Sequence, residues 1–548
     1  MSTSTSARGA DITAVARKLG LPAEAVLPYG LDKAKIDRGR LGALPPRGRL
    51  VLVTGMTPTA AGEGKTTTSI GLADGLARRG QQAIVVLREP SLGPCFGQKG
   101  GGTGFGRARL VPSADINLHF TGDFHAVTSA HNLLAALVDN HLHHGRTPAL
   151  DPARVSWRRV LDVNDRALRT VELARGKGNG PAHEGGFDIT AASEVMAILA
   201  LAGDRDDLRA RLARIVVGRG LDGEPVTAGQ LRAVGAMMAL LRDALHPNLV
   251  QTTEGTPALV HAGPFANIAH GTSSVVAARL GLGLADWAIT ECGFGFDLGG
   301  EKFFDIVGPQ AGLAPAVVVV VATTKALKLH GGRPADRLGE RDPDAVAAGL
   351  PNLARHLENV ALFGRPAVVG LNQFPGDHAD EHEVVRRFCE ERGVPFAVQD
   401  AAAHGGVAAT ELADRVMETA LTDPQPATPL YALDDPLAGK IEAIATKIYR
   451  ARKVVFTDAA NVTLAGLERD GFSRLRVCMA KTQSSFSDDP TKLNAPSEFD
   501  LTIRDLELAA GAGFIVALTG AMMRMPGLPR EPRAFDIDLV GDEIVGVG

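Results

Sequence analysis

The sequence predicts an α/β protein built around a mainly parallel sheet. Short runs rich in Val and Ile alternate along the chain with longer segments of helical periodicity. The runs have no polar face, as strands of a parallel sheet covered by helices on both sides require. The predicted strands are residues 49–54, 83–87, 316–322 and 367–371.

Size and composition narrow the class of protein. The 548 residues suffice for about two to four domains. The 63 glycines exceed the usual share of about 7%, and we expect them where the backbone turns tightly or approaches a ligand. The chain also has only two Trp and three Tyr.

Charge, cysteine spacing and the lack of a targeting signal favour a protein of the cytoplasm. Lys and Arg number 58 against 62 Asp and Glu, without a basic tail, so we expect neither nucleic acid nor a membrane as partner. No apolar run reaches the length of a membrane span, and residues 1–6 are polar. The four cysteines stand far apart, which is typical of a reduced compartment and not of a zinc ribbon.

The first predicted helix follows the first strand. In residues 66–79, Ile70, Ala73, Leu76 and Ala77 recur at helical spacing, and Gly80 is suited to end the helix. Between strand and helix lies Gly62-Glu63-Gly64-Lys65-Thr66-Thr67, which has the context of a phosphate-binding loop (P-loop).

This P-loop is a variant of the usual pattern, because Thr59 stands where the first Gly is expected. Lys65 is predicted to contact the transferred phosphoryl group, and Thr66 to ligate the Mg²⁺ of MgATP. The predicted fold is therefore P-loop NTPase-like. The candidate nucleotide-binding residues are Thr59, Ala60, Ala61, Gly62, Glu63, Gly64, Lys65 and Thr66.

A second candidate site follows the strand at 83–87. Ligands of open α/β sheets bind at the carboxyl ends of strands, so Arg88 and Glu89 are expected to face the phosphate site. Arg88 can hold a carboxylate or an acyl phosphate through two hydrogen bonds. The alternative is an ordinary solvated loop pair. The Gly-rich residues 93–106, Lys99 included, are either a ligand-contacting loop or simply a loop.

Histidines and carboxylates in the next segment do not form a metal motif. His119, His125 and His131 are six residues apart, a spacing that leaves one face of a helix, and we expect core and loop histidines. Asp115 and Asp123 could orient Mg²⁺ through water or serve as helix caps. Residues 291–302, another Gly-rich stretch with charges, are a weak signal by themselves.

Many separate blocks, in order along the chain, resemble the formate–tetrahydrofolate ligase family. They include the P-loop and residues 87–97, 115–123, 187–199, 263–271, 290–304, 480–483, 487–490 and 525–529. The resemblance implies a three-domain α/β enzyme, commonly a homotetramer, promoted by a monovalent cation such as potassium or ammonium. The implied reaction makes 10-formyltetrahydrofolate, ADP and phosphate from ATP, formate and tetrahydrofolate through formyl phosphate.

The resemblance also implies residue roles. Lys65 would hold the phosphates, Arg88 would bind formate and formyl phosphate, and Glu89 would lie near the pterin. Phe374 and Pro375 would form part of the folate pocket. The implied domains are residues 1–350, which bind ATP and formate, residues 351–428, which contribute to the folate pocket, and residues 429–548.

The folate side departs from the family pattern. Ala402 stands where a Trp usually completes the folate sandwich, and neither Trp157 nor Trp287 replaces it. Residues 307–309, Arg107 and Ser484 also differ from the usual residues. Two alternatives therefore stay open: a relative that makes formyl phosphate but formylates another amine, and a non-catalytic P-loop protein that binds nucleotide.

Overall fold

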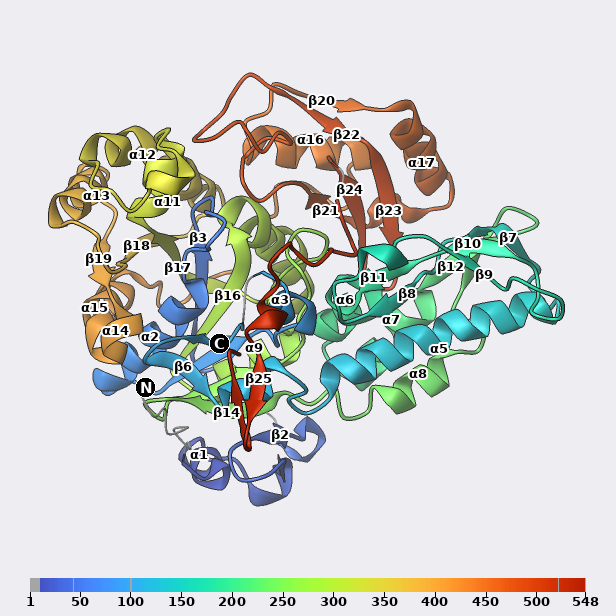
Figure 1. Ribbon diagram of the computed structural model, residues 1–548, viewed down its shortest axis with the longest axis horizontal. Helices are drawn as coiled ribbons and strands as arrows, with labels where there is room; N and C mark the ends of the chain where they lie inside the picture. The colour runs from blue at the N-terminus through green and yellow to red at the C-terminus, as the bar shows by residue number, and fades with distance from the viewer. Residues whose placement is uncertain (1–9, 43, 99–100, 521, 548) are drawn as a thin grey trace.

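The computed structural model describes residues 10–42, 44–98, 101–520 and 522–547. Within them the chain forms a mixed α/β fold whose largest element is a twelve-stranded sheet (Figure 1). Seven strands run parallel through its centre, with the P-loop strand β3 between β16 and β17. In spatial order they are β15 (Pro257–Val260), β4 (Ala83–Leu87), β16 (Trp287–Gly295), β3 (Arg49–Gly55), β17 (Pro315–Ala322), β18 (Ala367–Asn372) and β19 (Phe396–Gln399).

The remaining strands of this sheet are antiparallel and lie beyond β15. The pairing of β14 with β15, β2 and β6 joins them to the parallel strands. They are β1 (Val26–Pro28), β2 (Ala34–Ile36), β14 (Asn248–Thr252), β5 (Gly104–Phe105) and β6 (Ala108–Val111).

The four strands predicted from the sequence are confirmed as β3, β4, β17 and β18. The predicted helix 66–79 is confirmed as α2 (Lys65–Arg78), with Gly80 at φ +77° just beyond its last turn. Every residue of β4 and β17 is buried, because helices cover both faces of the sheet.

Alternate residues of the central strands enter two separate cores. Val51 and Val53 of β3 pack in the core that includes α2 and α15 (Thr410–Thr419). Leu50 and Leu52 pack in the larger core with α9 (Val275–Leu284) and α12 (Pro343–Leu362). The period of two along β3 thus builds a three-layer arrangement.

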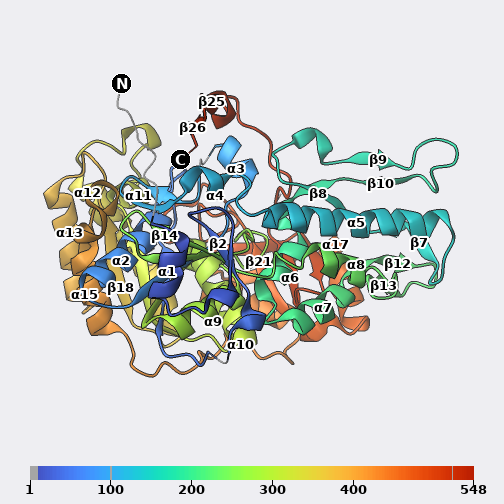
Figure 2. The ribbon, with the colours of Figure 1, turned by 90° about the horizontal axis from the view of Figure 1, so that it is seen from below.

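Two further parts flank the sheet (Figures 1 and 2). One is an arm in which the long helix α5 (Asp123–His143) runs beside small sheets. Its strands are β7 (Leu150–Val155), β8 (Arg159–Leu161), β9 (Val171–Leu173), β10 (His183–Gly185), β11 (Phe187–Ile189), β12 (Val216–Gly220) and β13 (Pro225–Thr227). Its shorter helices are α6 (Glu194–Leu201), α7 (Arg205–Arg214) and α8 (Val234–Leu240).

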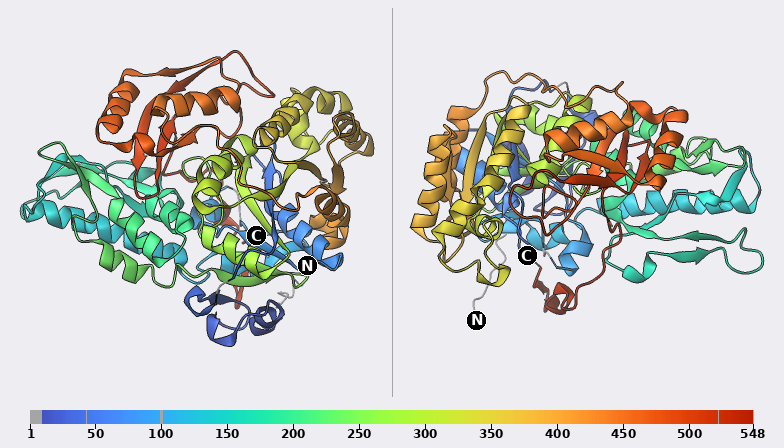
Figure 3. Two further views of the ribbon diagram at one scale, coloured as in Figure 1. Left: turned by 180° about the vertical axis from the view of Figure 1, so that it is seen from behind. Right: turned by 90° about the horizontal axis from the view of Figure 1, so that it is seen from above.

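The other part is C-terminal and packs beside both the main sheet and the arm (Figure 3). In it β21 pairs in parallel with β24, and β24 pairs antiparallel with β23. Its elements are α16 (Leu437–Lys447), β20 (Lys453–Phe456), α17 (Asp458–Arg469), β21 (Arg476–Ala480), β22 (Asp500–Ile503), β23 (Asp505–Ala509) and β24 (Phe514–Leu518), followed by the hairpin β25 (Asp538–Val540) and β26 (Glu543–Val545).

The expected domain division stays a prediction. Residue 350 lies inside α12, and strands from both sides of it, β17 and β18, pair in one sheet. The expected edge at 428/429 falls between α15 and α16. The remaining helices are α1 (Ile12–Lys18), α3 (Leu92–Phe96), α4 (Ser113–Asn117), α10 (Gly308–Ala311), α11 (Thr324–His330), α13 (Ala379–Glu391) and α14 (Ala401–His404).

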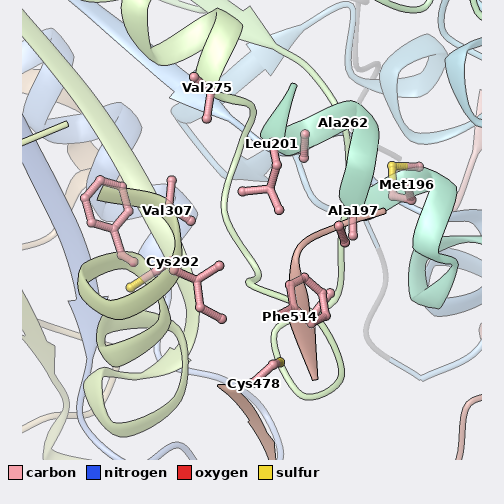
Figure 4. Close-up of a cluster of buried hydrophobic side chains, with 14 of the residues drawn as sticks. Met196, Ala197, Leu201, Ala262, Val275, Cys292, Val307, Cys478 and Phe514 are labelled. Atoms are coloured by element: carbon pink, nitrogen blue, oxygen red, sulfur yellow. The ribbon is translucent and has the colours of Figure 1, made fainter. Parts of the chain in front are cut away.

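A continuous apolar core joins these parts. Figure 4 shows Met196 and Ala197 of α6, Cys292 of β16 and Phe514 of β24 converging from separate parts of the chain, and all four are buried. The four cysteines of the chain are all described and are buried free thiols. Among the described residues, no helix is both long and apolar enough to cross a bilayer.

Candidate active site

The carboxyl ends of the parallel strands bring the candidate residues to one edge of the sheet. The P-loop follows β3, Arg88 and Glu89 follow β4, and Phe374 lies two residues after β18. Because neighbouring parallel strands end side by side, residues far apart in sequence meet here. This edge therefore contains the predicted nucleotide and acyl-group residues together.

The P-loop has the backbone geometry of an anion-binding loop. Gly62 and Gly64 have φ of +82° and +75°, and Gly64 is the N-cap residue of the 14-residue helix α2. The first amide groups of α2 have no partner within the helix, and its dipole favours negative charge there. Asn372 fixes the loop from β18, because its Nδ2 donates to the carbonyl of Glu63 at 3.0 Å.

The carboxylate of Glu63 is used within the loop. It accepts a hydrogen bond from the Thr59 backbone N–H at 2.6 Å and another from the hydroxyl of Thr323. Glu63 is buried. Its side chain thus braces the loop against the N-terminus of α11, and only its backbone is left to contact a nucleotide.

Lys65 opens α2 at the mouth of the loop. Burial lowers the pKa of its ammonium, and the nearby carboxylates of Glu291 and Glu63 oppose that shift. A partly desolvated cation at the start of the P-loop helix is suited to a phosphate group.

Glu291 links Thr66 to Arg88. Thr66 Oγ1 donates to Glu291 Oε2 at 2.8 Å, and Glu291 Oε1 lies 3.7 Å from Arg88 Nη2. Glu291 is buried on β16, the strand between β3 and β4. The helix of the P-loop and the end of β4 thus share one carboxylate.

Arg88 is held by a second contact. Its Nη1 donates to the carbonyl of Pro264 at 3.2 Å, in a loop that runs from β15 to α9. Its Nε is buried and has no hydrogen-bond partner among the described residues. His270 of the same loop is fully buried, and burial, with Lys302 and Arg88, lowers its pKa to about 3. His270 is therefore uncharged at neutral pH.

Glu89 occupies a different environment from Arg88. It is buried, and burial together with the carboxylate of Asp123 raises its pKa well above the ordinary range. Asp123 itself pairs with Lys35 at 2.7 Å and accepts from Asn248 Nδ2 at 2.8 Å. Asp123 is not the cap expected as one alternative, because Gly122 is the N-cap residue of α5 and Asp123, the first residue of the helix, forms a buried ion pair.

The predicted folate residues lie on the other side of the P-loop. Phe374 is half-buried, and Lys325 Nζ lies 4.8 Å from its ring centre, while Pro375 is exposed. Ala402 is half-buried on α14, where its carbonyl accepts from Arg107 N at 2.8 Å. Gly106 has φ +61° beside it, and any Cβ at Gly106 would collide with that carbonyl.

Of the three evenly spaced histidines, His131 lies in the core and His119 in a turn, as expected, whereas His125 is exposed on α5. His131 is buried, stacks on Trp157 with ring centres 4.1 Å apart, and pairs through Nε2 with the Arg158 carbonyl at 2.9 Å. Burial lowers its pKa to about 4. No group of three or more potential metal ligands among His, Cys, Asp and Glu occurs in the described residues. Lys99 of the Gly-rich loop lies outside them.

Sequence reasoning missed the role of Glu291. The strand from 287 to 295 was not predicted, because a carboxylate, a thiol and glycines interrupt its apolar pattern. The available signal was an acidic residue two positions after the apolar residues Ala288 and Ile289, near the end of a potential strand.

Comparison with known proteins decides the family. The family model described as formate–tetrahydrofolate ligase matches residues 1–548. The chain is 54% identical over 534 residues to the formate–tetrahydrofolate ligase of Maricaulis maris (strain MCS10), which covers 96% of each chain. It is 54% identical over 541 residues to that of Hyphomonas neptunium (strain ATCC 15444), covering 97% of each.

The chain belongs to the formate–tetrahydrofolate ligase family. The resemblance inferred from the sequence motifs is thereby confirmed. Formate–tetrahydrofolate ligases are enzymes of folate one-carbon metabolism, so the non-catalytic alternative loses its support. The match extends over the arm and the C-terminal part as well as the P-loop edge.

Proposed function

We propose that this protein couples ATP cleavage to formylation of N10 of tetrahydrofolate, with formyl phosphate as the intermediate. The observation that carries the proposal is the contact chain Thr66–Glu291–Arg88 beside Lys65. This contact chain joins the P-loop to the Arg88 guanidinium, which is suited to binding a small carboxylate. The family relationship indicates the class of reaction.

In the first step a formate oxygen attacks the γ-phosphorus of ATP. The bond from that phosphorus to the β-bridging oxygen breaks, giving formyl phosphate and ADP. The P-loop amides and Lys65 would neutralise the phosphate oxygens, and Arg88 would hold formate by two parallel hydrogen bonds. Two anions must approach each other, so these cations contribute mainly by positioning and charge neutralisation.

The residues present fit a magnesium ion. The Thr66 hydroxyl and the Glu291 carboxylate are hard oxygen donors, and they already lie 2.8 Å apart. A strand carboxylate beside the P-loop hydroxyl is the ligand pair that P-loop NTPases use. Bound there with ATP, Mg²⁺ would supply charge neutralisation at the phosphates.

In the second step N10 of tetrahydrofolate attacks the formyl carbon. The carbon–oxygen bond to phosphate breaks, phosphate leaves with that oxygen, and N10 loses its proton. We assign the folate pocket to the face between Phe374 and α14, with Pro375 at its rim. Glu89 we place near the pterin. With Ala402 on α14, only the Phe374 side offers a ring for stacking.

We also propose, from the family alone, that a monovalent cation, potassium or ammonium, promotes the activity. We further propose, from the family alone, a homotetramer in the cytoplasm.

One assay tests the proposed reaction. Purified protein is incubated with MgATP, formate and tetrahydrofolate, and ADP and 10-formyltetrahydrofolate are measured together. We expect equal amounts of both products, with neither formed when formate is omitted.

Because Ala402 replaces a Trp that usually stacks on folate, an amine other than tetrahydrofolate is the alternative formyl acceptor. ADP formation that depends on formate but not on folate, without formylfolate, would indicate that another amine is formylated. ADP formation independent of formate would contradict both reactions and favour nucleotide binding as the function.

A further inference from the structure

A second cavity lies away from the P-loop edge, at the junction of the arm, α6 and the C-terminal part. Its volume is about 480 Å³, a size typical of small-molecule sites. Its described lining includes residues of β7, β12, α6, α17, β23 and β24. It includes none of Lys65, Thr66, Arg88, Glu89 and Phe374.

The cavity wall contains four arginines and three carboxylic acids. Three of the arginines pair with carboxylates, of which Glu507 pairs with Arg524. Asp188 forms ion pairs with two of the arginines, because it lies 2.9 Å from Arg158 Nε and 3.1 Å from Arg524 Nε. Burial raises the pKa of Glu194 to about 7, so its negative charge is partly lost at neutral pH. The four arginines are Arg154, Arg158, Arg219 and Arg524.

Arg154 is the arginine most available to a ligand. It is exposed at the end of β7 and makes no ion pair or hydrogen bond through its guanidinium with another described residue. Arg219, by contrast, pairs with Asp470.

The rest of the wall is apolar and partly aromatic. Trp157 and His131, stacked on each other, lie on the arm side, and Phe514 and Val516 lie on the C-terminal side. Ala197 and Phe514, both in the lining, are shown in Figure 4. His131 Nδ1 is buried without a hydrogen-bond partner among the described residues. A flat apolar group would meet complementary surfaces here.

We propose that this cavity is a second binding site, specific for an organic anion with a flat, ring-sized apolar body. The arginines, Arg154 first, select the negative charge, and the apolar wall takes the ring. One loop contacts both this cavity and the active site. Ile268 and Ala269 line the cavity and belong to the loop whose Pro264 carbonyl accepts from Arg88. An occupant that shifts this loop changes the position of Arg88.

Calorimetric titration of the full-length protein with 1-anilinonaphthalene-8-sulfonate, an aromatic monoanion, tests the site. Saturating MgATP is present throughout to block the nucleotide site. We expect Arg154→Glu to weaken binding about fivefold or more, since one favourable charge becomes repulsive. Ser156→Trp, an exposed lining position, should weaken it about tenfold or more by filling the cavity.

The matched control is Arg175→Glu, an exposed arm arginine that does not line the cavity. It should bind the probe within about twofold of the unaltered protein. The neutral analogue N-phenyl-1-naphthylamine should show no dependence on Arg154. Unchanged affinity in both Arg154→Glu and Ser156→Trp, or complete loss of binding in MgATP, would overturn the proposal.

A kinetic experiment tests whether an occupant of the cavity affects Arg88. This test rests on the proposed function. Saturating probe should change the KM for formate by about twofold or more and leave the KM for ATP unchanged. Binding in the cavity without an effect on formate would contradict the coupling.

Discussion

Glu291 contacts the hydroxyl of Thr66 and lies beside the guanidinium of Arg88, although neither lies near it in sequence. A carboxylate in this position can do two things: complete a magnesium site with Thr66 and hold Arg88 in place. Both depend on its charge, whereas the hydrogen bond from Thr66 needs only an acceptor.

Glu291→Gln should therefore lower kcat by about 100-fold or more, with little change in thermal unfolding, because glutamine keeps an acceptor for Thr66. Steady-state kinetics over a range of Mg²⁺ concentrations measure the effect. Glu358→Gln, at an exposed glutamate of α12, is the control and should behave as the unaltered enzyme. Equal activity of the two variants would remove Glu291 from the site.

Substitutions of Lys65 and of Arg88 should have different kinetic effects. Lys65→Ala is expected to abolish turnover, because the phosphate oxygens lose their nearest cation. Arg88→Ala should chiefly raise the KM for formate, and Arg88→Lys should restore it only in part, since a lysine cannot make two parallel hydrogen bonds. Initial rates with formate and ATP varied separately distinguish these effects. Normal formate kinetics in Arg88→Ala would remove the role assigned to it.

At the scale of elements, the P-loop depends on the strand beyond its nearest neighbour. Asn372 of β18 approaches Gly64 so closely that a Cβ there would collide with its Nδ2. Gln399 of β19 then donates to Asn372 Oδ1 at 2.8 Å and to Thr68 Oγ1 at 2.9 Å. The loop and its helix are thus held by hydrogen bonds from two strands, β18 and β19.

Gly64→Ala should weaken ATP binding strongly and destabilise the fold by about 1–3 kcal/mol, through strain and collision together. Gly80→Ala is the matched control, because φ is +77° there but nothing lies within 4 Å of the added Cβ. It should cost about 1 kcal/mol of stability and leave ATP binding intact. Nucleotide titration and chemical denaturation of both variants measure the difference. Similar ATP affinity in the two would contradict this view of the loop.

A second prediction concerns the helix α14. Ala402→Trp should lower the KM for tetrahydrofolate about fivefold, the effect of one added aromatic contact of about 1 kcal/mol. Ala403→Trp places the same ring on the exposed neighbouring residue and should have no such effect. Tetrahydrofolate kinetics of both variants provide the test. Equal effects would place the folate elsewhere.

The sequence allowed the elements with an uninterrupted apolar pattern to be predicted. The strands β3, β4, β17 and β18 and the helix α2 all have one. The strand β16 does not, because Glu291 and Cys292 lie within it. The order of strands, with β16 between β3 and β4, follows from long-range pairing that no local pattern encodes. The P-loop and Arg88 were therefore predictable, whereas the carboxylate joining them was not.

At the scale of the whole molecule, Glu194 joins the arm to the C-terminal part. Its Oε1 accepts from Gly511 N at 2.7 Å, across more than half of the chain. Burial raises its pKa to about 7 from 4.5. The native state therefore holds this proton more tightly than the unfolded state, and the group's contribution to stability falls as the pH rises from about 4.5 to 7.

Glu194→Gln should remove this loss, since glutamine keeps the acceptor oxygen without the charge. At each pH, the unfolding free energy of the variant is compared with that of the unaltered protein. This difference should be about 1–2 kcal/mol more in favour of the variant at pH 8 than at pH 5. Denaturant unfolding at the two pH values measures it. A constant difference between the proteins would show that Glu194 titrates normally.

If formate is activated by phosphorylation at the P-loop edge, one of its oxygens must be transferred to phosphate, and this transfer can be measured. The purified protein is supplied with MgATP, tetrahydrofolate and formate labelled with ¹⁸O in both oxygens, and the released phosphate is analysed by mass spectrometry. Because the attacking formate oxygen leaves with phosphate, we expect one ¹⁸O in each phosphate formed. Phosphate without ¹⁸O, alongside formation of 10-formyltetrahydrofolate, would contradict it.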